Sequence, residues 1–218
     1  MTPSVITSAP AEGFLKAHLG TTAVPISIKW AGTDATSGIN HYDLEESIDG
    51  GAFSLVSSPT TASATVNLNP GHSYRFEVRA TDNAGNVSGF TAGPTFTLTA
   101  YQETASNITY TSGWTQQAVT GAYGGSVKFA TVAGKKATLS FTGSQVAWVS
   151  TIASNRGSGS VSIDGGAAAT VSTHGTTTKP AMVVYTKTLA AGTHSLVLKV
   201  LGTAGHPRVD VDAFLVIK

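Results

Sequence analysis

The stretch LNPGHSYRFEVRATDNAGNVS, residues 68–88, constrains the fold more than any other part of the chain. A Pro-Gly turn opens it, and a polar Asp-Asn-Ala-Gly-Asn turn closes it. Between the turns, apolar and polar side chains alternate: the apolar set is Tyr74, Phe76, Val78 and Ala80, and the polar set is Ser73, Arg75, Glu77 and Arg79. A period of two with one apolar face is typical of a half-buried antiparallel strand. We therefore expect a fold built from packed sheets.

Leu68, Pro70, Gly71 and Tyr74 are spaced as in the L-x-P-G-x-x-Y stretch of fibronectin type III domains, which residues 15–99 resemble. The resemblance implies an immunoglobulin-like sandwich whose tyrosine hydroxyl fastens a corner between the two sheets. The alternation pattern adds strands around it, with Trp30 as a core anchor and a tight hairpin at Asp49-Gly50-Gly51. About seven strands are expected here, the others being Pro25–Trp30, Ile39–Ser47, Phe53–Val56, Ala64–Leu68 and Pro94–Thr99.

The composition favours two ordinary all-β domains, which we place at residues 1–100 and 101–218. Only 11% of the 218 residues are charged and no long amphipathic helical pattern occurs. The absence of cysteine excludes disulfides and Cys-ligated metal. No apolar run reaches the roughly 18 residues of a membrane span. The halves carry net charges of −4 and +5, but these charges are scattered, so we expect no nucleic-acid partner.

The second half repeats the alternating pattern and predicts a two-sheeted jelly roll. Nine strands are expected: Ile108–Tyr110, Val127–Ala130, Lys136–Thr142, Gln145–Ile152, Ser158–Ile163, Ala167–Thr173, Met182–Leu189, Ser195–Leu201 and Val209–Ile217. The hexapeptide SIDGGA occurs at Ser47–Ala52 and again at Ser162–Ala167. Because Asp-Gly is what a tight hairpin selects, we attribute this match to shared turn chemistry rather than to duplication.

Residues 103–218 resemble the galactose-binding-like jelly rolls of secreted bacterial glycoside hydrolases and surface proteins, many of which are carbohydrate-binding modules. The resemblance is carried by Trp114, Gly124-Gly125, Phe141-Thr142-Gly143, Val146-Ala147-Trp148, Val161-Ser162-Ile163-Asp164-Gly165, Leu189-Ala190-Ala191-Gly192-Thr193-His194 and Val211-Asp212-Ala213-Phe214. Proteins of this fold often hold a structural calcium between an acidic residue near the domain start and an aspartate in the last strand. Glu103 and Asp212 occupy comparable places, so the resemblance allows a structural calcium there. We expect no other cofactor.

Strand connections in an antiparallel sandwich alternate between its two ends, so the order of the loops sorts them. One end collects the longer polar loops Ala133–Lys135, Ser154–Gly157, His174–Lys179 and Gly202–Arg208, and the opposite end keeps minimal turns. We expect the ligand at the longer loops. The hypothesis is that Asn155, Arg156 and Arg208 converge on a polar ligand. The flanking candidates are His174, His206, Trp114 and an exposed Tyr123, since sugar binding commonly uses an aromatic ring.

No catalytic arrangement emerges from the sequence, so we expect no enzyme activity. Asp210 and Asp212 lie side by side on one strand, whereas glycosidases place their carboxylates across a cleft. His72 and His194 are expected to satisfy turn backbone groups. The leading hypothesis is a non-catalytic, glycan-binding fragment of a larger extracellular or cell-surface bacterial protein, with the fibronectin-like domain as a spacer. The alternative is a structural or adhesive surface-fibre unit that contacts protein.

Overall fold

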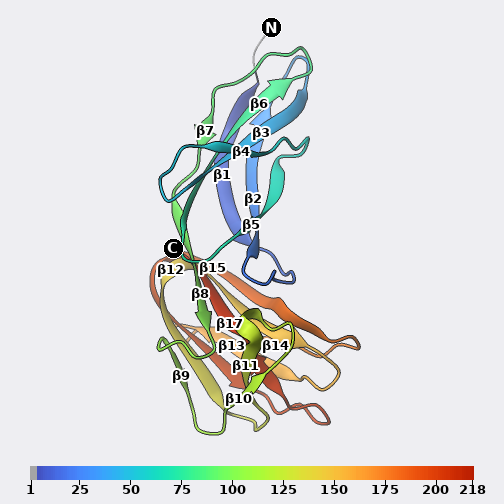
Figure 1. The fold of residues 1–218 in the computed structure, drawn as a ribbon, viewed down its shortest axis with the longest axis vertical. Helices are drawn as coiled ribbons and strands as arrows, with labels where there is room; N and C mark the ends of the chain where they lie inside the picture. The colour runs from blue at the N-terminus through green and yellow to red at the C-terminus, as the bar shows by residue number, and fades with distance from the viewer. Residues whose placement is uncertain (1–3) are drawn as a thin grey trace. The chain divides into compact units, whose positions relative to one another are not determined.

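A computed structural model describes residues 4–218, and it confirms the all-β prediction. Within these residues the helical element is one short 3-10 turn, η1 (Tyr123–Gly125). The chain divides into two compact units (Figure 1). Unit 1 contains the chain up to Phe14 and Pro25–Leu98, and unit 2 contains Leu15–Val24 and Thr99–Lys218. Thus the segment 15–24 packs with unit 2, although the sequence analysis assigned it to residues 1–100.

Unit 1 is built from two sheets. The first has three strands in the order β1 (Val5–Phe14), β2 (Val24–Thr33) and β5 (Ser63–Leu68). The second has the order β8 (Phe96–Gln102), β6 (Ser73–Asp82), β3 (Ile39–Ile48) and β4 (Ser54–Ser57), with β7 (Thr91–Ala92) also paired to β6. Strand β8 begins in unit 1 and ends in unit 2.

The core of unit 1 follows the predicted alternation. Tyr74, Phe76, Val78 and Ala80 of β6 are all buried, as is Trp30 of β2. The Tyr74 hydroxyl donates to the Asn69 carbonyl at 2.8 Å and accepts from the Asn69 amide at 3.0 Å. The expected tyrosine staple is therefore present, and it closes the turn that precedes β6.

Unit 2 also has two sheets. The smaller has the order β10 (Thr115–Ala118), β11 (Ser126–Ala130) and β16 (Val209–Val211). The larger has the order β14 (Ala169–Ser172), β13 (Ser158–Ile163), β15 (Lys179–Val200), β12 (Lys136–Ile152) and β17 (Ala213–Ile217), followed by the end of β8. A short strand, β9 (Ile108–Tyr110), pairs with the first part of β12.

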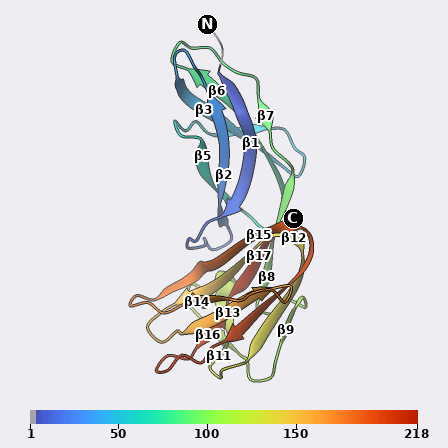
Figure 2. The same ribbon diagram turned by 180° about the vertical axis from the view of Figure 1, so that it is seen from behind.

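Strands β12 and β15 each combine two of the expected strands. Their ladder runs from Lys136↔Lys199 to Ile152↔Lys179, with a register shift between Gly143 and Gln145. Both strands arch over at this region (Figures 1 and 2). A side chain at Gly143 would lie 2.6 Å from the Ile217 carbonyl oxygen, so this close approach requires glycine. The bend brings both halves of β12 onto one core, which contains the fully buried Trp148.

No helix within residues 4–218 is long and apolar enough to cross a membrane.

Candidate functional site

The four longer loops of unit 2 lie together at the end opposite the β12–β15 bend. Backbone hydrogen bonds link them directly: Gly157 N–H donates to the Arg208 carbonyl at 2.8 Å, and Gly175 N–H donates to the Ala153 carbonyl at 3.2 Å. Gly134 N–H donates to the Val200 carbonyl at 2.8 Å. Isolated bridges join Ala153 to His174 and Arg156 to Arg208. The structure therefore places Asn155, Arg156, His174, His206 and Arg208 in one loop cluster.

The two arginines of this cluster converge on Asp210 rather than on open space. Arg156 Nε lies 2.6 Å from Asp210 Oδ2, and Arg208 Nε lies 2.6 Å from Asp210 Oδ1. Asp210 is fully buried, and the Arg156 side chain is 8% exposed. A buried carboxylate needs such compensation, because its desolvation is otherwise costly. The arginines therefore stabilise the base of the loop cluster.

Arg208 is held by two further contacts. Its Nη1 donates to Gln117 Oε1 at 2.8 Å, and its guanidinium carbon lies 3.9 Å from the centre of the Phe129 ring. Its Nη2 is buried and finds no hydrogen-bond partner within residues 4–218. A planar guanidinium stacked on an aromatic ring is rigid, so Arg208 ties β10 and β11 to the loop cluster.

The groups that remain accessible at this end are Asn155, His174 and His206. Asn155 and His174 are exposed, and His206 is half-buried. The His174 and His206 rings stack with centroids 4.3 Å apart and planes at 28°. Asn155 Oδ1 accepts a hydrogen bond from Arg156 Nη1, which orients its amide. The order of the loops along the chain predicts both histidines at this end, but their stacking depends on loop conformations that spacing does not fix.

The aromatic candidates lie differently from what the sequence suggested. Tyr123 was expected to be exposed, but this expectation is wrong: it is 7% exposed, and its hydroxyl donates to the Thr22 carbonyl at 3.3 Å. The segment 15–24 supplies this cover, which local sequence around Tyr123 does not reveal. Trp114 is half-buried and packs against Tyr110, with ring centroids 5.1 Å apart. Neither ring is a free stacking platform.

Glu103 and Asp212 lie together inside unit 2. The Glu103 amide donates to the Asp212 carbonyl at 3.2 Å, and both residues are buried. Glu103 Oε1 accepts hydrogen bonds from Gln116 Nε2 at 3.2 Å and from Ser126 Oγ. Asp212 Oδ2 accepts from the Tyr123 amide at 3.1 Å. The two carboxylates thus share one interior region beside η1.

Asp212 is an unusual carboxyl group. Burial raises its pKa to about 7, and the charges of Glu103 and Asp210 act in the same direction. Its Oδ1 makes no hydrogen bond of standard geometry in the described part of the chain, although the Ala181 amide, like that of Tyr123, acts on the carboxylate and lowers its pKa. Gln102 Oε1 is also buried without a hydrogen-bond partner. Gln102 Oε1 lies against Gly124 of η1, where a side chain would approach it to 2.6 Å.

The region beside η1 contains carboxylate and amide oxygens, which are the kinds of ligand that Ca²⁺ prefers. The available donors are Asp212 Oδ1, Gln102 Oε1 and the Glu103 carboxylate. No group of three or more His, Cys, Asp or Glu side chains suited to a metal occurs among residues 4–218. A bound cation here would therefore also depend on amide or backbone oxygens.

A cavity of about 340 Å³ that was not predicted from the sequence lies beside η1. It is bounded by two loops, and the residues that line it are His18, Leu19, Gly20, Thr21, Gly121, Ala122, Gly124 and Gly125. Its walls are mainly glycine and small side chains. The pairing of residues 15–24 with unit 2 creates this cavity, so only the tertiary structure reveals it.

Comparison with known proteins connects the chain with parts of polysaccharide-degrading enzymes. No protein-family model matches it. Over 80 residues it is 42% identical to Endoglucanase B of Cellulomonas fimi, covering 36% of this chain and 8% of that protein. Over 205 residues it is 29% identical to Chitinase A1 of Niallia circulans, covering 84% of this chain and 28% of that protein. The chain thus spans less than a third of either relative, and the similarity supports a carbohydrate-related role.

Solved structures give only distant likenesses. A two-domain esterase active on acetylated mannans matches with a TM-score of 0.47 and 12% identity, covering 56% of this chain and 36% of that one. A Paenibacillus xanthan lyase matches with a TM-score of 0.42 and 17% identity, covering 98% of this chain and 25% of that one.

Proposed function

We propose that this chain is a non-catalytic carbohydrate-binding segment of a larger extracellular bacterial protein. The observation that carries the proposal is its similarity to limited parts, 8% and 28%, of an endoglucanase and a chitinase. A segment that resembles limited parts of two enzymes with different names suits an accessory function, and we infer that this function is attachment to a polysaccharide. On this proposal unit 2 binds glycan and unit 1 acts as a spacer.

The binding surface proposed for unit 2 is the accessible part of its loop cluster, formed by Asn155, His174 and His206. Two stacked imidazole rings offer a flat aromatic surface, against which the C–H face of a pyranose can pack. The Asn155 amide can donate to and accept from neighbouring sugar hydroxyls. The buried arginines hold the loops in place, so little conformational entropy is lost on binding.

The proposal of a non-catalytic chain is supported by the burial and the partners of the carboxylates in unit 2. Asp210 is neutralised by Arg156 and Arg208, and Asp212 is buried beside Glu103. Glycoside hydrolysis instead needs two carboxyl groups facing a substrate cleft about 5–9 Å apart. We assign Glu103 and Asp212 a structural role, in which a bound Ca²⁺ would satisfy the unpaired Asp212 Oδ1 and fasten η1 to the last strands.

Retention on insoluble cellulose and chitin tests the proposal. The full chain should be retained on at least one of them, and a His174→Ala/His206→Ala double variant should lose at least about tenfold in affinity. Lys29→Ala, at an exposed position of unit 1, is the matched control and should bind like the wild type. Circular dichroism verifies that the double variant is folded.

An opposite result identifies the alternative. If the wild type is not retained and instead assembles as its concentration rises, measured by sedimentation velocity, the chain is a structural or adhesive fibre unit. Hydrolysis of the polysaccharide by the purified chain would contradict the non-catalytic assignment.

A further inference from the structure

The repeated hexapeptide builds the same hairpin in each unit. Asp49 and Asp164 both adopt a left-handed backbone, with φ of 51° and 52°. Each carboxylate accepts from the amide of a serine on the neighbouring strand, Ser73 or Ser195, at 2.8 Å in both cases. Each also contacts the histidine that precedes this serine, His72 at 2.6 Å and His194 at 2.7 Å. The two hairpins are therefore equivalent residue by residue.

A groove lies beside each hairpin, with a volume of about 210 Å³ in unit 1 and about 170 Å³ in unit 2. The strand registers align the two grooves, because Ser47 pairs with Arg75 as Ser162 pairs with Val197. The equivalent lining positions are Ser47 and Ser162, Gly51 and Gly166, Phe53 and Ala168, and Arg75 and Val197.

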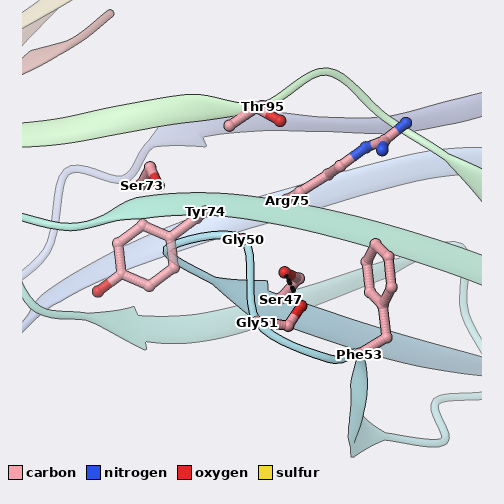
Figure 3. Close-up of a pocket in the computed structure, with 8 residues that line it drawn as sticks. All are labelled: Ser47, Gly50, Gly51, Phe53, Ser73, Tyr74, Arg75 and Thr95. Carbon is pink, nitrogen blue, oxygen red and sulfur yellow. Dashed lines mark hydrogen bonds between the residues drawn. The ribbon is translucent and has the colours of Figure 1, made fainter.

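The equivalent hairpin of unit 2 shows which side chains the turn requires. Its hairpin has the same turn hydrogen bonds with Ala168 and Val197, so neither an aromatic ring nor a guanidinium is needed for the turn. Phe53 and Arg75 instead change the chemistry of the unit 1 groove. Both residues line this groove: in the view of Figure 3 the Arg75 side chain extends to the side of β6 on which Thr95 lies, and the Phe53 ring lies on the other side, near Ser47 and Gly51.

The Arg75 guanidinium is held in place but remains accessible. Its Nε donates to the Gly93 carbonyl at 3.1 Å, which uses one of its five N–H groups. The residue is exposed, as is Thr95, whose hydroxyl also lines the groove. The groove thus combines a half-buried ring, an oriented guanidinium and an exposed hydroxyl.

We propose that this groove binds one neutral pyranose ring of a glycan, which gives unit 1 a binding role in addition to that of a spacer. This inference rests on the proposed function. The ring suits the C–H face of a sugar, and the guanidinium suits two adjacent hydroxyls. A volume of about 210 Å³ is below the roughly 300 Å³ at which sites for larger ligands begin, so it suits a single ring.

The charges around the groove select a neutral sugar over an acidic one. Residues 1–100 contain four Lys and Arg against eight Asp and Glu. Asp49 belongs to the hairpin itself, and Glu77 lies near both Arg75 and Glu45. The negative charges around the groove would repel the carboxylate of an acidic sugar, and Arg75 alone would offset this repulsion.

Nuclear magnetic resonance titration of the full chain with cellopentaose and chitopentaose tests the proposal. At least one of them should shift the Arg75 Nε–H and Gly51 amide signals. Phe53→Ala should weaken this site at least about tenfold, and Arg75→Val should abolish it. Both variants copy residues that the equivalent unit 2 hairpin already accommodates. Leu55→Ala, at a 60% exposed position outside the groove lining, should leave the site unchanged.

The outcomes separate this inference from the function on which it rests. Shifts at His174 without any at Arg75 and Gly51 would overturn the unit 1 site alone. Equal affinity of the wild type and both groove variants would overturn it as well. If neither oligosaccharide shifts any signal, the glycan-binding function falls and this site with it. Tighter binding of pentagalacturonate would overturn the assignment to a neutral sugar.

Discussion

Two aspartates that lie two positions apart, Asp210 in β16 and Asp212 in the link between β16 and β17, have opposite environments. Asp210 is fully buried with a guanidinium at each oxygen, which is the arrangement that makes a buried charge tolerable. Asp212 is equally buried, but it receives the Tyr123 amide and lies near a second carboxylate. Asp210 therefore anchors the loop cluster, and Asp212 is left with unsatisfied acceptor capacity.

Arg156→Ala should destabilise the chain by about 3–5 kcal/mol, because it removes one of the partners of a fully buried charge. Arg156→Lys should recover part of this loss, since it restores the charge but not the planar donor group. Urea unfolding followed by tryptophan fluorescence measures both. A loss below about 1 kcal/mol for Arg156→Ala would mean that Arg208 alone compensates Asp210.

Asp212 should couple calcium binding to pH. Because its pKa is raised to about 7 from 3.8, the folded chain keeps a proton that the unfolded chain releases between these values. In EGTA, the contribution of Asp212 to the free energy of unfolding should therefore fall as the pH rises from about 4 to 7. Asp212→Asn should remove this dependence and stabilise the calcium-free chain at pH 8 by on the order of 2–4 kcal/mol.

Calcium itself should raise the melting temperature of the wild type, more at pH 8 than at pH 6, because the ligand must be ionised. Differential scanning calorimetry with and without EGTA measures this shift, and Asp212→Asn should abolish it. An equal shift in Asp212→Asn would place any calcium elsewhere.

At the scale of elements, the hairpin of SIDGGA is the clearest case in which a short sequence determines a local structure. The same turn, nearly the same φ and the same contacts of the aspartate with a histidine and a serine amide arise in the sheets of both units. The interpretation as shared turn chemistry is consistent with this. The two histidines were expected to satisfy turn backbone groups, but both contact the turn aspartate through its carboxylate, and His194 also contacts the Ala190 carbonyl. What the turn does not determine is the groove beside it, where Phe53 and Arg75 replace Ala168 and Val197.

The hairpin of unit 2 should titrate as a pair. The contact with Asp164 raises the pKa of His194, and the contact with His194 lowers the pKa of Asp164. The histidine contribution to stability is complete below its ordinary value near 6.5 and is lost as the pH rises through the raised pKa. The aspartate contribution is present above 3.8 and is lost as the pH falls through the lowered pKa.

Asp164→Asn should return the His194 pKa toward its ordinary value, which a proton NMR titration of the imidazole measures. Asp49→Asn in the equivalent hairpin of unit 1 is the matched control and should leave His194 unchanged. A His194 pKa that stays raised in Asp164→Asn would assign the effect to the Ala190 carbonyl, which lies 2.9 Å from its Nε2.

At the scale of the whole molecule, sequence patterns predicted the features that depend on residues close together in the chain and on the order of the strands. The alternation in β6, the tyrosine staple and the gathering of four loops all follow from local periods and strand order. The contact between Arg156 and Asp210 was missed because the two residues are 54 positions apart and meet only after folding. Arg208 is two positions from Asp210, but spacing alone does not show that its guanidinium turns back to this carboxylate. The cover over Tyr123 was missed for the same reason as the contact of Arg156, since Thr22 lies 101 positions away.

The segment 15–24 is expected to stabilise unit 2, although it precedes most of unit 1 in the chain. Leu19 N–H donates to the Ala181 carbonyl at 2.9 Å, and Val183 N–H donates to the Ala17 carbonyl at 3.0 Å. Leu19 is 1% exposed, so its burial contributes about 1.5–3 kcal/mol. A fragment of residues 99–218 should therefore exchange amide hydrogens at 181–183 and 121–125 faster than the full chain. Leu19→Ala in the full chain should reproduce part of this loss, whereas equal protection in the fragment would show that the segment is dispensable.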